Sequence, residues 1–315
     1  MTSSAPEKKI FKISRRTAWL EPVILLCFVA MSFLNAIAQK DAAPKQTPQA
    51  ASISAPPSAD AILERAYHDM YNLDFDAALR KTEEAKTINR DDPTPWVAQA
   101  CAVLFREFNR LHILRSEMFA SDEKFDARPA QSWQPATRKQ FDDALNGAEK
   151  IAQHRLTLDK NDDKALFALT LVNGLKADDS ALISKKNLTA LSYTKSADGF
   201  AERLLAKYPD AYDAHIATGM GKYIIGGKAA PVRWMLRLGG LKGDQEEGVR
   251  ELKMVAEHGH YLAPFAEILL SFDDLRHKNK ESARKRLTAL HESFPGNPLF
   301  GEELAKLDKP DTAGH

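Results

Sequence analysis

Residues 270–300, LSFDDLRHKNKESARKRLTALHESFPGNPLF, carry the pattern that decides the fold. Leu287 stands eight residues before Pro295, and Phe300 stands five residues after that proline. Two earlier segments repeat this spacing, one with Ala85, Pro93 and Ala98 and the other with Ala201, Pro209 and Ala214. This order is typical of stacked helix pairs: a small or apolar residue near the end of one helix, then a helix-breaking residue, then an apolar residue in the next helix. One pair cannot bury its apolar face alone, so the pattern predicts that the pairs pack against one another.

The chain from Ala59 onward has the same helical character. Apolar residues recur every three or four positions, as on one face of a helix, and no alternating strand pattern is found. The predicted helices are marked by apolar residues at 62–73, 77–88, 95–119 and 136–158, with shorter helices after them. Clusters of Asp, Asn and Pro are predicted to end one helix and cap the next, at 91–93, 159–163, 208–210 and 294–298. The sequence therefore predicts an all-α fold.

This pattern resembles the tetratricopeptide repeat family, whose unit is about 34 residues long. The last unit fits best, with Leu270, Ser271, Ala283, Leu287, Leu290 and Pro295 at the favoured places. A first unit fits with Ala66, Phe75, Ala78 and Ala85, although Pro93 comes three residues late, and a middle unit offers Ala197, Ala201, Leu204, Pro209 and Gly219. The resemblance covers residues 59–307 with two complete units. It implies a divergent TPR-like α–α superhelix in which the number of repeats stays open.

The resemblance also implies a binding surface. In tetratricopeptide arrays the first helix of each pair lines a concave groove that holds an extended peptide or a helix of a partner. The candidate groove residues come from helices that open units: Tyr67, Tyr71, Asn72, His215, Lys222 and Tyr223. For each of them, ordinary packing or solvation is the alternative role. The lysine and asparagine clamp that some members use for carboxylate termini is not recognisable in this sequence.

A glycine-rich insertion at 225–243 interrupts the repeat, and eight of the fifteen glycines lie between Gly219 and Gly248. It contains a short predicted helix at 231–238, with Arg233 and Arg237 on one face and Trp234 beside them. Three roles compete. The helix packs over the array with its arginines in solvent, or it binds a partner through Arg233, Trp234 and Arg237. The third role, a helix on a membrane surface, is disfavoured because eight residues and two charges are few.

Residues 1–38 have the pattern of an export signal. Five basic residues precede an apolar run over 23–38, and the run closes on Ala36-Ile37-Ala38, which predicts cleavage between Ala38 and Gln39. An uncleaved inner-membrane anchor is the alternative, but the run is shorter than the roughly 20 residues that span a bilayer. An Ala- and Pro-rich linker is expected at 39–58, a folded domain at 59–309 and a disordered tail at 310–315.

Composition excludes several classes of protein. The chain has 44 basic and 43 acidic residues, so it does not show the excess of basic residues that is usual in nucleic-acid-binding proteins. Its hydrophobic fraction of 44% is typical of a globular protein. Removal of 1–38 leaves 39 basic and 41 acidic residues and a single cysteine, Cys101, which rules out an internal disulfide. Cys101 stands in an apolar helical stretch, so we expect it to be buried.

No catalytic, metal or cofactor motif is found, so no enzyme is predicted. His258-Gly259-His260 places two histidines on different helix faces, with Gly259 as a helix cap and without a third ligand at a recognisable spacing. The glycine-rich residues 221–228 lack the lysine that a phosphate-binding loop requires after its second glycine. Acidic pairs are interpreted as helix caps or exposed charges, namely Asp142-Asp143, Asp178-Asp179 and Asp273-Asp274.

The sequence therefore favours a non-enzymatic scaffold that binds a protein or peptide in a bacterial periplasm or cell envelope. The alternative from another class is an envelope hydrolase or carbohydrate-processing helical protein whose catalytic carboxylates meet only in the folded chain. It predicts a deep polar pocket with paired Asp or Glu. A third possibility is a membrane-tethered assembly factor that retains residues 1–38.

Overall fold

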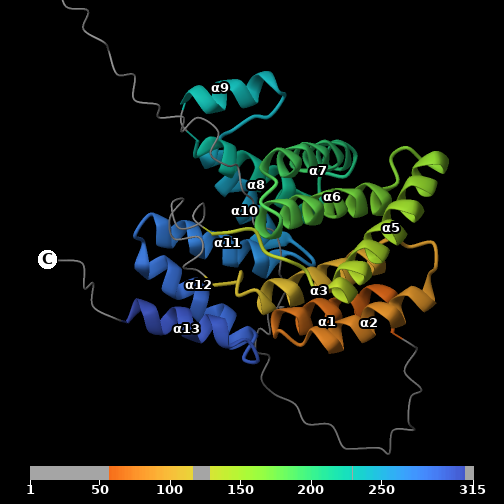
Figure 1. The fold of residues 1–315 in the computed structure, drawn as a ribbon, viewed down its shortest axis with the longest axis horizontal. Coiled ribbons are helices and arrows are strands. Elements are labelled where there is room, and N and C mark those ends of the chain that lie inside the picture. Colours follow the sequence, from red (N-terminus) through yellow and green to blue (C-terminus); the bar gives the residue numbers. More distant parts are fainter. Residues whose placement is uncertain (1–56, 116–127, 229, 309–315) are drawn as a thin grey trace, which may run out of the picture.

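The computed structural model describes residues 57–115, 128–228 and 230–308, and all regular elements in these ranges are helices (Figure 1). The first half contains α1 (Ala59–Tyr71), α2 (Phe75–Ile88), α3 (Thr94–Arg110), α5 (Pro135–Leu158), α6 (Asp163–Asp178), a π-helical turn (Asp179–Ile183) and α7 (Asn187–Lys207). The second half contains a 3-10 turn (Tyr212–Ala214), α8 (His215–Gly226), α9 (Ala230–Leu238), α10 (Gln245–His258), α11 (Ala263–Arg276), α12 (Lys280–Ser293) and α13 (Pro298–Leu307). The predicted all-α class is confirmed.

Short polar side chains begin many of the helices. The Asp74 carboxylate accepts from the Ala77 amide at 3.0 Å, and the Asp162 carboxylate accepts from the Ala165 amide at 2.8 Å. Each such bond satisfies an amide that has no partner inside its own helix. All four predicted breaker clusters lie where one helix ends and the next begins, and Asp163 and Pro298 are the first residues of α6 and α13.

The predicted helix at 95–119 is wrong at its carboxyl end, because α3 ends at Arg110. His112 adopts a left-handed backbone with φ of 56°, and the Ile113 amide donates back to the Phe108 carbonyl at 2.8 Å. This bond closes the last turn of α3 in the manner of a helix cap. Residues 116–119 lie outside the described residues.

Two hairpins share one turn geometry although they lie at opposite ends of the chain. Leu73 between α1 and α2 and Lys278 between α11 and α12 both have a left-handed backbone, with φ of 60° and 59°. Each is followed by a capping residue, Asp74 or Asn279, whose carbonyl accepts from an amide four residues on. An ion pair links the two helices of each hairpin at equivalent positions, Lys81 with Asp69 and Arg286 with Asp274. The first and last hairpins are therefore two copies of one structural unit.

Small residues let the two helices of a hairpin approach closely. Ala66 and Ala78 in the first hairpin and Ser271 and Ala283 in the last are fully buried. The hairpin of α8 and α10 has glycines instead, and a Cβ added at Gly248 would lie only 2.6 Å from the Gly219 carbonyl oxygen. Such a distance leaves no room for a side chain, so the contact between α8 and α10 requires glycine at this position.

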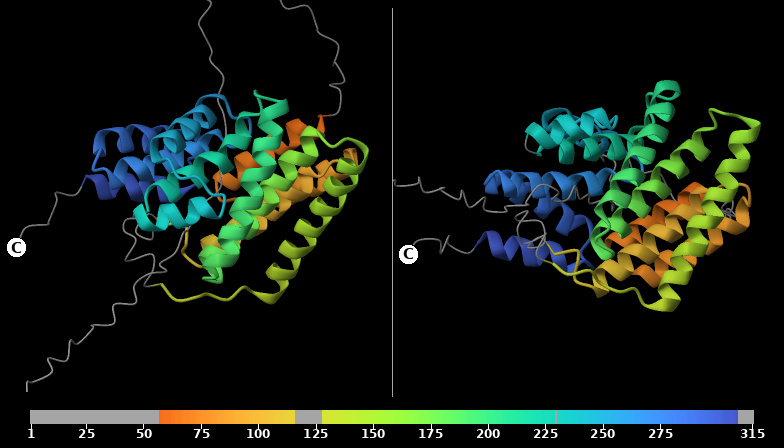
Figure 2. Two further views of the ribbon diagram at one scale, coloured as in Figure 1. Left: turned by 90° about the horizontal axis from the view of Figure 1, so that it is seen from above. Right: turned by 45° about the horizontal axis from the view of Figure 1, so that its top comes forward.

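The helices pack in the order of the chain. Each long helix contacts the next one, from α1 with α2 to α12 with α13, and α10 follows α8 because α9 lies outside this series. Alternate helices also touch, since α3 contacts α1 and α6, and α6 contacts α8. Figure 2 shows the resulting curved stack, with α1 to α3 beside α11 to α13 at the point where its ends meet.

Contacts of α1 close this stack. Tyr67 stacks on Tyr261 with ring centroids 4.9 Å apart, and the Tyr71 hydroxyl donates to the Tyr261 carbonyl at 2.9 Å. The Asn297 amide donates to the Tyr71 carbonyl at 2.9 Å, and the Gly296 amide donates to the Asn72 side-chain oxygen at the same distance. The first helix is thus joined to two loops that follow it by 190 residues or more.

The fold also tests the predictions for Cys101, the insertion and Gly259. Cys101 is buried in the core, as predicted, and the expected helix in the insertion is α9. Gly259 caps α10, although with an extended backbone. In the ranges given above, no helix is both long and apolar enough to cross a membrane. The proposed signal at 1–38, most of the linker at 39–58 and the tail at 310–315 lie outside the described residues.

Two glycine substitutions test the close packing of the hairpins. Gly248→Ala should lower the free energy of unfolding by about 1–3 kcal/mol, because its Cβ meets backbone atoms that cannot move aside. Gly199→Ala, in the middle of α7 with open space around it, should raise that free energy by about 0.5–1 kcal/mol. Urea unfolding followed by circular dichroism measures both. Equal stability of the two variants would contradict the packing described for α8 and α10.

Candidate functional site

The predicted binding residues fall in three separate places. Tyr67, Tyr71 and Asn72 lie on α1 and at its end, where they join the first hairpin to the C-terminal loops. His215, Lys222 and Tyr223 lie on α8. The third group, on α9, consists of Arg233, Trp234 and Arg237.

The tyrosines of α1 are core residues and do not face an open groove. Tyr67 and Tyr71 are each only 1% exposed. Burial raises the pKa of both hydroxyls well above the usual value, because a phenolate has no water there. The sequence left packing as the alternative role of both tyrosines but could not indicate that Tyr261 and Phe294 cover this face of α1.

On α8 the structure assembles a buried charge network, which we call the Glu251 cluster: His215, Thr218, Lys222 and Glu251. The Glu251 carboxylate accepts from the Thr218 hydroxyl at 2.6 Å and from Lys222 Nζ at 2.5 Å, and His215 Nδ1 lies 3.8 Å from it. Burial raises the pKa of this carboxyl, but the contacts of His215, Lys222 and Thr218 outweigh burial and lower it overall. Two of the predicted residues thus meet a glutamate on α10 that sequence reasoning did not single out.

Asp198 on α7 borders the Glu251 cluster and behaves in the opposite way. Burial, with the nearby charge of Glu202, raises its pKa to about 6, although the charge of Lys222 opposes the shift. Two carboxyls with pKa values displaced in opposite directions are the arrangement of an acid and a base in many hydrolases. Charge networks that only stabilise a fold also shift pKa values, so the pattern marks a candidate for chemistry and does not define one.

Tyr223, the next residue on α8, belongs to a different contact. Its hydroxyl donates to the Asp273 carboxylate on α11 at 2.7 Å. Burial and this hydrogen bond together raise the pKa of the hydroxyl, because both disfavour the phenolate. Tyr223 therefore links α8 to α11.

The interpretation of Asp178-Asp179 as exposed or capping charges is wrong. Asp178 is fully buried, and Asp179 is 7% exposed. Asp179 accepts from the Trp133 indole at 2.7 Å and from Arg138 at 2.8 Å, so it anchors the start of α5 against the π-helical turn. The signal that was missed is the apolar surroundings of this pair, between Leu175, Ala177 and the run Ala181 to Ile183.

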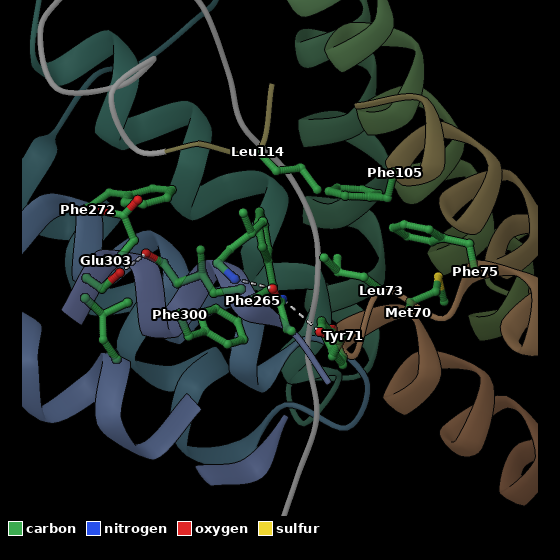
Figure 3. A pocket seen from close by; sticks show the side chains of 15 residues that line it. Met70, Tyr71, Leu73, Phe75, Phe105, Leu114, Phe265, Phe272, Phe300 and Glu303 are labelled. Atoms are coloured by element: carbon green, nitrogen blue, oxygen red, sulfur yellow. Dashed lines mark hydrogen bonds between the residues drawn. The ribbon is translucent and has the colours of Figure 1, made fainter. Parts of the chain in front are cut away.

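An apolar cavity opens where the two ends of the stack meet, and we call it the cleft (Figure 3). Its volume is about 60 Å³. Five phenylalanine rings dominate the lining, and they belong to Phe75, Phe105, Phe265, Phe272 and Phe300. Figure 3 shows that they come from both ends of the chain, from α2 and α3 on one side and from α11 and α13 on the other.

The polar groups of the cleft stand among this apolar lining. Asn297 and Glu303 both line the cleft. The side-chain amide of Asn297 donates to the Tyr71 carbonyl, and Glu303 accepts from Lys306 at 2.6 Å. Tyr71 is the one predicted binding residue that lines the cleft. Leu114 and Leu299 add partly exposed apolar side chains to the lining.

A second cavity of about 210 Å³ lies where several helices begin. Its lining includes Asp60 of α1, Asp163 and Lys164 of α6, and both His258 and His260. Several of its charged side chains are paired, because Lys164 lies 3.8 Å from Asp60 within the lining and 2.5 Å from Asp92 outside it, and His260 lies 3.2 Å from Glu64. In the described part of the chain, no three His, Cys, Asp or Glu side chains come together as ligands of a metal ion.

Comparison with known proteins adds no assignment. Neither a family model, nor a curated protein, nor a solved structure matches this chain. The cleft, the Glu251 cluster and α9 are therefore the features from which a function can be proposed.

The raised pKa of Asp198 predicts a pH-dependent stability. The folded chain binds the proton of the Asp198 carboxyl more tightly than the unfolded chain does. Protonated Asp198 therefore stabilises the fold fully below about pH 4, and this stabilisation is lost as the pH rises through about 6. Asp198→Asn should therefore raise the free energy of unfolding by ~1 kcal/mol at pH 7.5 and leave it nearly unchanged at pH 4. The exposed Asp91→Asn serves as control for the loss of one negative charge. Equal gains for Asp198→Asn at both pH values would contradict the assignment.

Proposed function

We propose that the chain is a TPR-like α–α superhelix that serves as a non-enzymatic scaffold and binds a protein or peptide partner. The finer fold assignment is supported by the two equivalent hairpins, by the small residues at their helix crossings and by the packing of each helix on its neighbours. In arrays of this kind, the face shared by alternate helices is the usual binding surface.

The observation that carries the proposed function is the cleft. It opens on the side where α1 and α3 face α11 and α13, and it is lined by aromatic rings with Asn297 and Glu303 among them. Apolar walls with a few placed polar groups are characteristic of binding sites. A volume of about 60 Å³ suits a small aliphatic side chain of a peptide better than a drug-sized molecule.

The proposed location is the bacterial periplasm or cell envelope, and it rests on the sequence of residues 1–38. The basic residues, the apolar run and the Ala36-Ile37-Ala38 site support export with cleavage after Ala38. A chain starting at Gln39 in a membrane-free envelope fraction is the outcome that this proposal expects. Retention of residues 1–38 would instead support the membrane-tethered alternative.

A matched pair of leucines tests binding in the cleft. Leu299 is the second residue of α13 and lines the cleft, and Leu188 is the second residue of α7 and is 76% exposed. An acidic residue in the first helical turn is tolerated well, so Leu299→Asp and Leu188→Asp should both fold. Leu299→Asp should weaken partner binding at least tenfold, while Leu188→Asp should leave it unchanged.

The measurement is photo-crosslinking from position 299 in envelope extract, followed by the affinity of the captured partner for each variant. A partner that binds both variants equally does not use the cleft. If no partner crosslinks to position 299 above the background at position 188, the proposed function is wrong.

The hydrolase alternative keeps one observation in its favour, namely the opposite pKa shifts of Asp198 and Glu251. If these carboxyls act as acid and base, Asp198→Asn and Glu251→Gln should each abolish hydrolysis of envelope glycans. Unchanged hydrolysis, or none in the unmodified protein, would remove this alternative.

A further inference from the structure

Helix α9 lies at the periphery of the molecule, beyond α7 and α8, in Figure 1 and in the right view of Figure 2. It touches the rest of the protein through one narrow apolar stripe and through Arg233, which donates to the Gly226 carbonyl at 3.0 Å. Leu236 is its only buried residue, and it packs with Ile225 of α8 and with Leu241, with the partly buried Val232 and Leu191 beside them. Val232 and Leu236 are four residues apart, so they lie on the same face of the helix.

The outer face of α9 is apolar. Trp234 is 66% exposed, Met235 is 47% exposed and Leu238 is 70% exposed. Leu238 is four residues from Trp234 and three from Met235, so the three side chains form one continuous surface. They make up half of the six large hydrophobic side chains that are exposed in the described part of the chain, and the other three belong to α2, α5 and α7. Such a concentration of exposed apolar groups is typical of an interaction surface.

The charges nearest to α9 in the sequence have one sign. Between Asp213 and Asp244 the sequence contains no acidic residue, while Lys228, Arg233, Arg237 and Lys242 surround α9 in the chain. Lys195 reaches the end of α9 from α7, where its Nζ donates to the Gly239 carbonyl at 2.6 Å. A large exposed Trp, two further apolar side chains and several nearby cations complement a surface that is apolar inside and anionic at its edge.

We infer that α9 docks on the surface of an anionic phospholipid bilayer, with Trp234, Met235 and Leu238 inserted among the acyl chains. Arg237 and its neighbouring cations then lie at the level of the phosphates. Tryptophan favours this boundary because its ring is apolar and its N–H is polar. The cations that flank α9 in the sequence, together with Lys195, favour an anionic lipid surface.

The sequence-based objection that eight residues and two charges are too few loses its force in the folded protein. An isolated helix of this length would have to form on the membrane, which is unfavourable because helix nucleation is costly. Here α9 is already folded against Ile225 and Leu191, so docking requires little ordering. The fold also adds Lys195, which the local sequence around α9 does not reveal.

The test is quenching of Trp234 fluorescence by brominated acyl chains, with the full-length chain on vesicles. The contribution of Trp234 is the difference between the unmodified chain and Trp234→Phe, which removes the signals of the other tryptophans. On vesicles that contain phosphatidylglycerol, Trp234 should be strongly quenched. On vesicles of phosphatidylcholine alone, or in high salt, the quenching should fall at least fivefold.

A matched pair of variants distinguishes docking through α9 from non-specific hydrophobic adsorption to the vesicles. Leu238 ends α9 and Leu158 ends α5, and both are at least 70% exposed. Leu238→Gln and Arg237→Gln should each reduce the quenching of Trp234 several-fold, while Leu158→Gln should leave it unchanged. Circular dichroism confirms that each variant is folded.

Three results would overturn the inference. The first is that Trp234 stays open to aqueous iodide, with no quenching from the acyl chains. The second is that the chain self-associates through α9 in the absence of lipid and that Leu238→Gln disperses it, which would make a second copy the occupant. The third is a specific protein crosslinked from position 234 while lipid fails to quench. The cleft plays no part in any of these results, so they leave the proposed function untouched.

Discussion

The contact of α1 with the loops after α10 and α12 is the constraint on which the rest of the structure depends. Tyr67 and Tyr71 are buried because Tyr261, Phe294 and Asn297 cover them. A stack of helix pairs in which each pair touches only its neighbours would leave the first helix exposed on one side. Here that side is covered by the last pairs, so the array is curved tightly enough for its two ends to meet.

This closure determines which surfaces are open to the proposed partner. The inner surface of the stack is largely filled by its own side chains, and the tyrosines expected in an open groove form part of that filling. The cleft stays open at the junction, with walls from both ends of the chain. The glycine-rich insertion places α9 outside the stack, and Trp234 is therefore exposed on the surface of the molecule.

The sequence predicted the features that are decided locally. Helices, breaker clusters, the short helix of the insertion and the buried Cys101 follow from spacing and from capping residues within a few positions. The sites that sequence reasoning missed depend on distant partners. Glu251 meets Lys222 across 29 residues, and Asp179 meets Trp133 across 46, so no local pattern reveals either contact. Which face of α9 is exposed is also decided by residues outside α9, notably Ile225 and Leu191.

Native-state hydrogen exchange of the Gly296 amide tests the closure most directly. This amide donates to the Asn72 side chain, so its exchange reports the contact between the two ends. If the ends are locked together, Gly296 and the amides at the end of α1 will exchange with the same opening free energy, and Asn72→Ala will lower it for both. If the amides at the end of α1 exchange faster while the Gly296 amide stays protected, α1 opens independently. The two ends would then not be joined, which contradicts the closure.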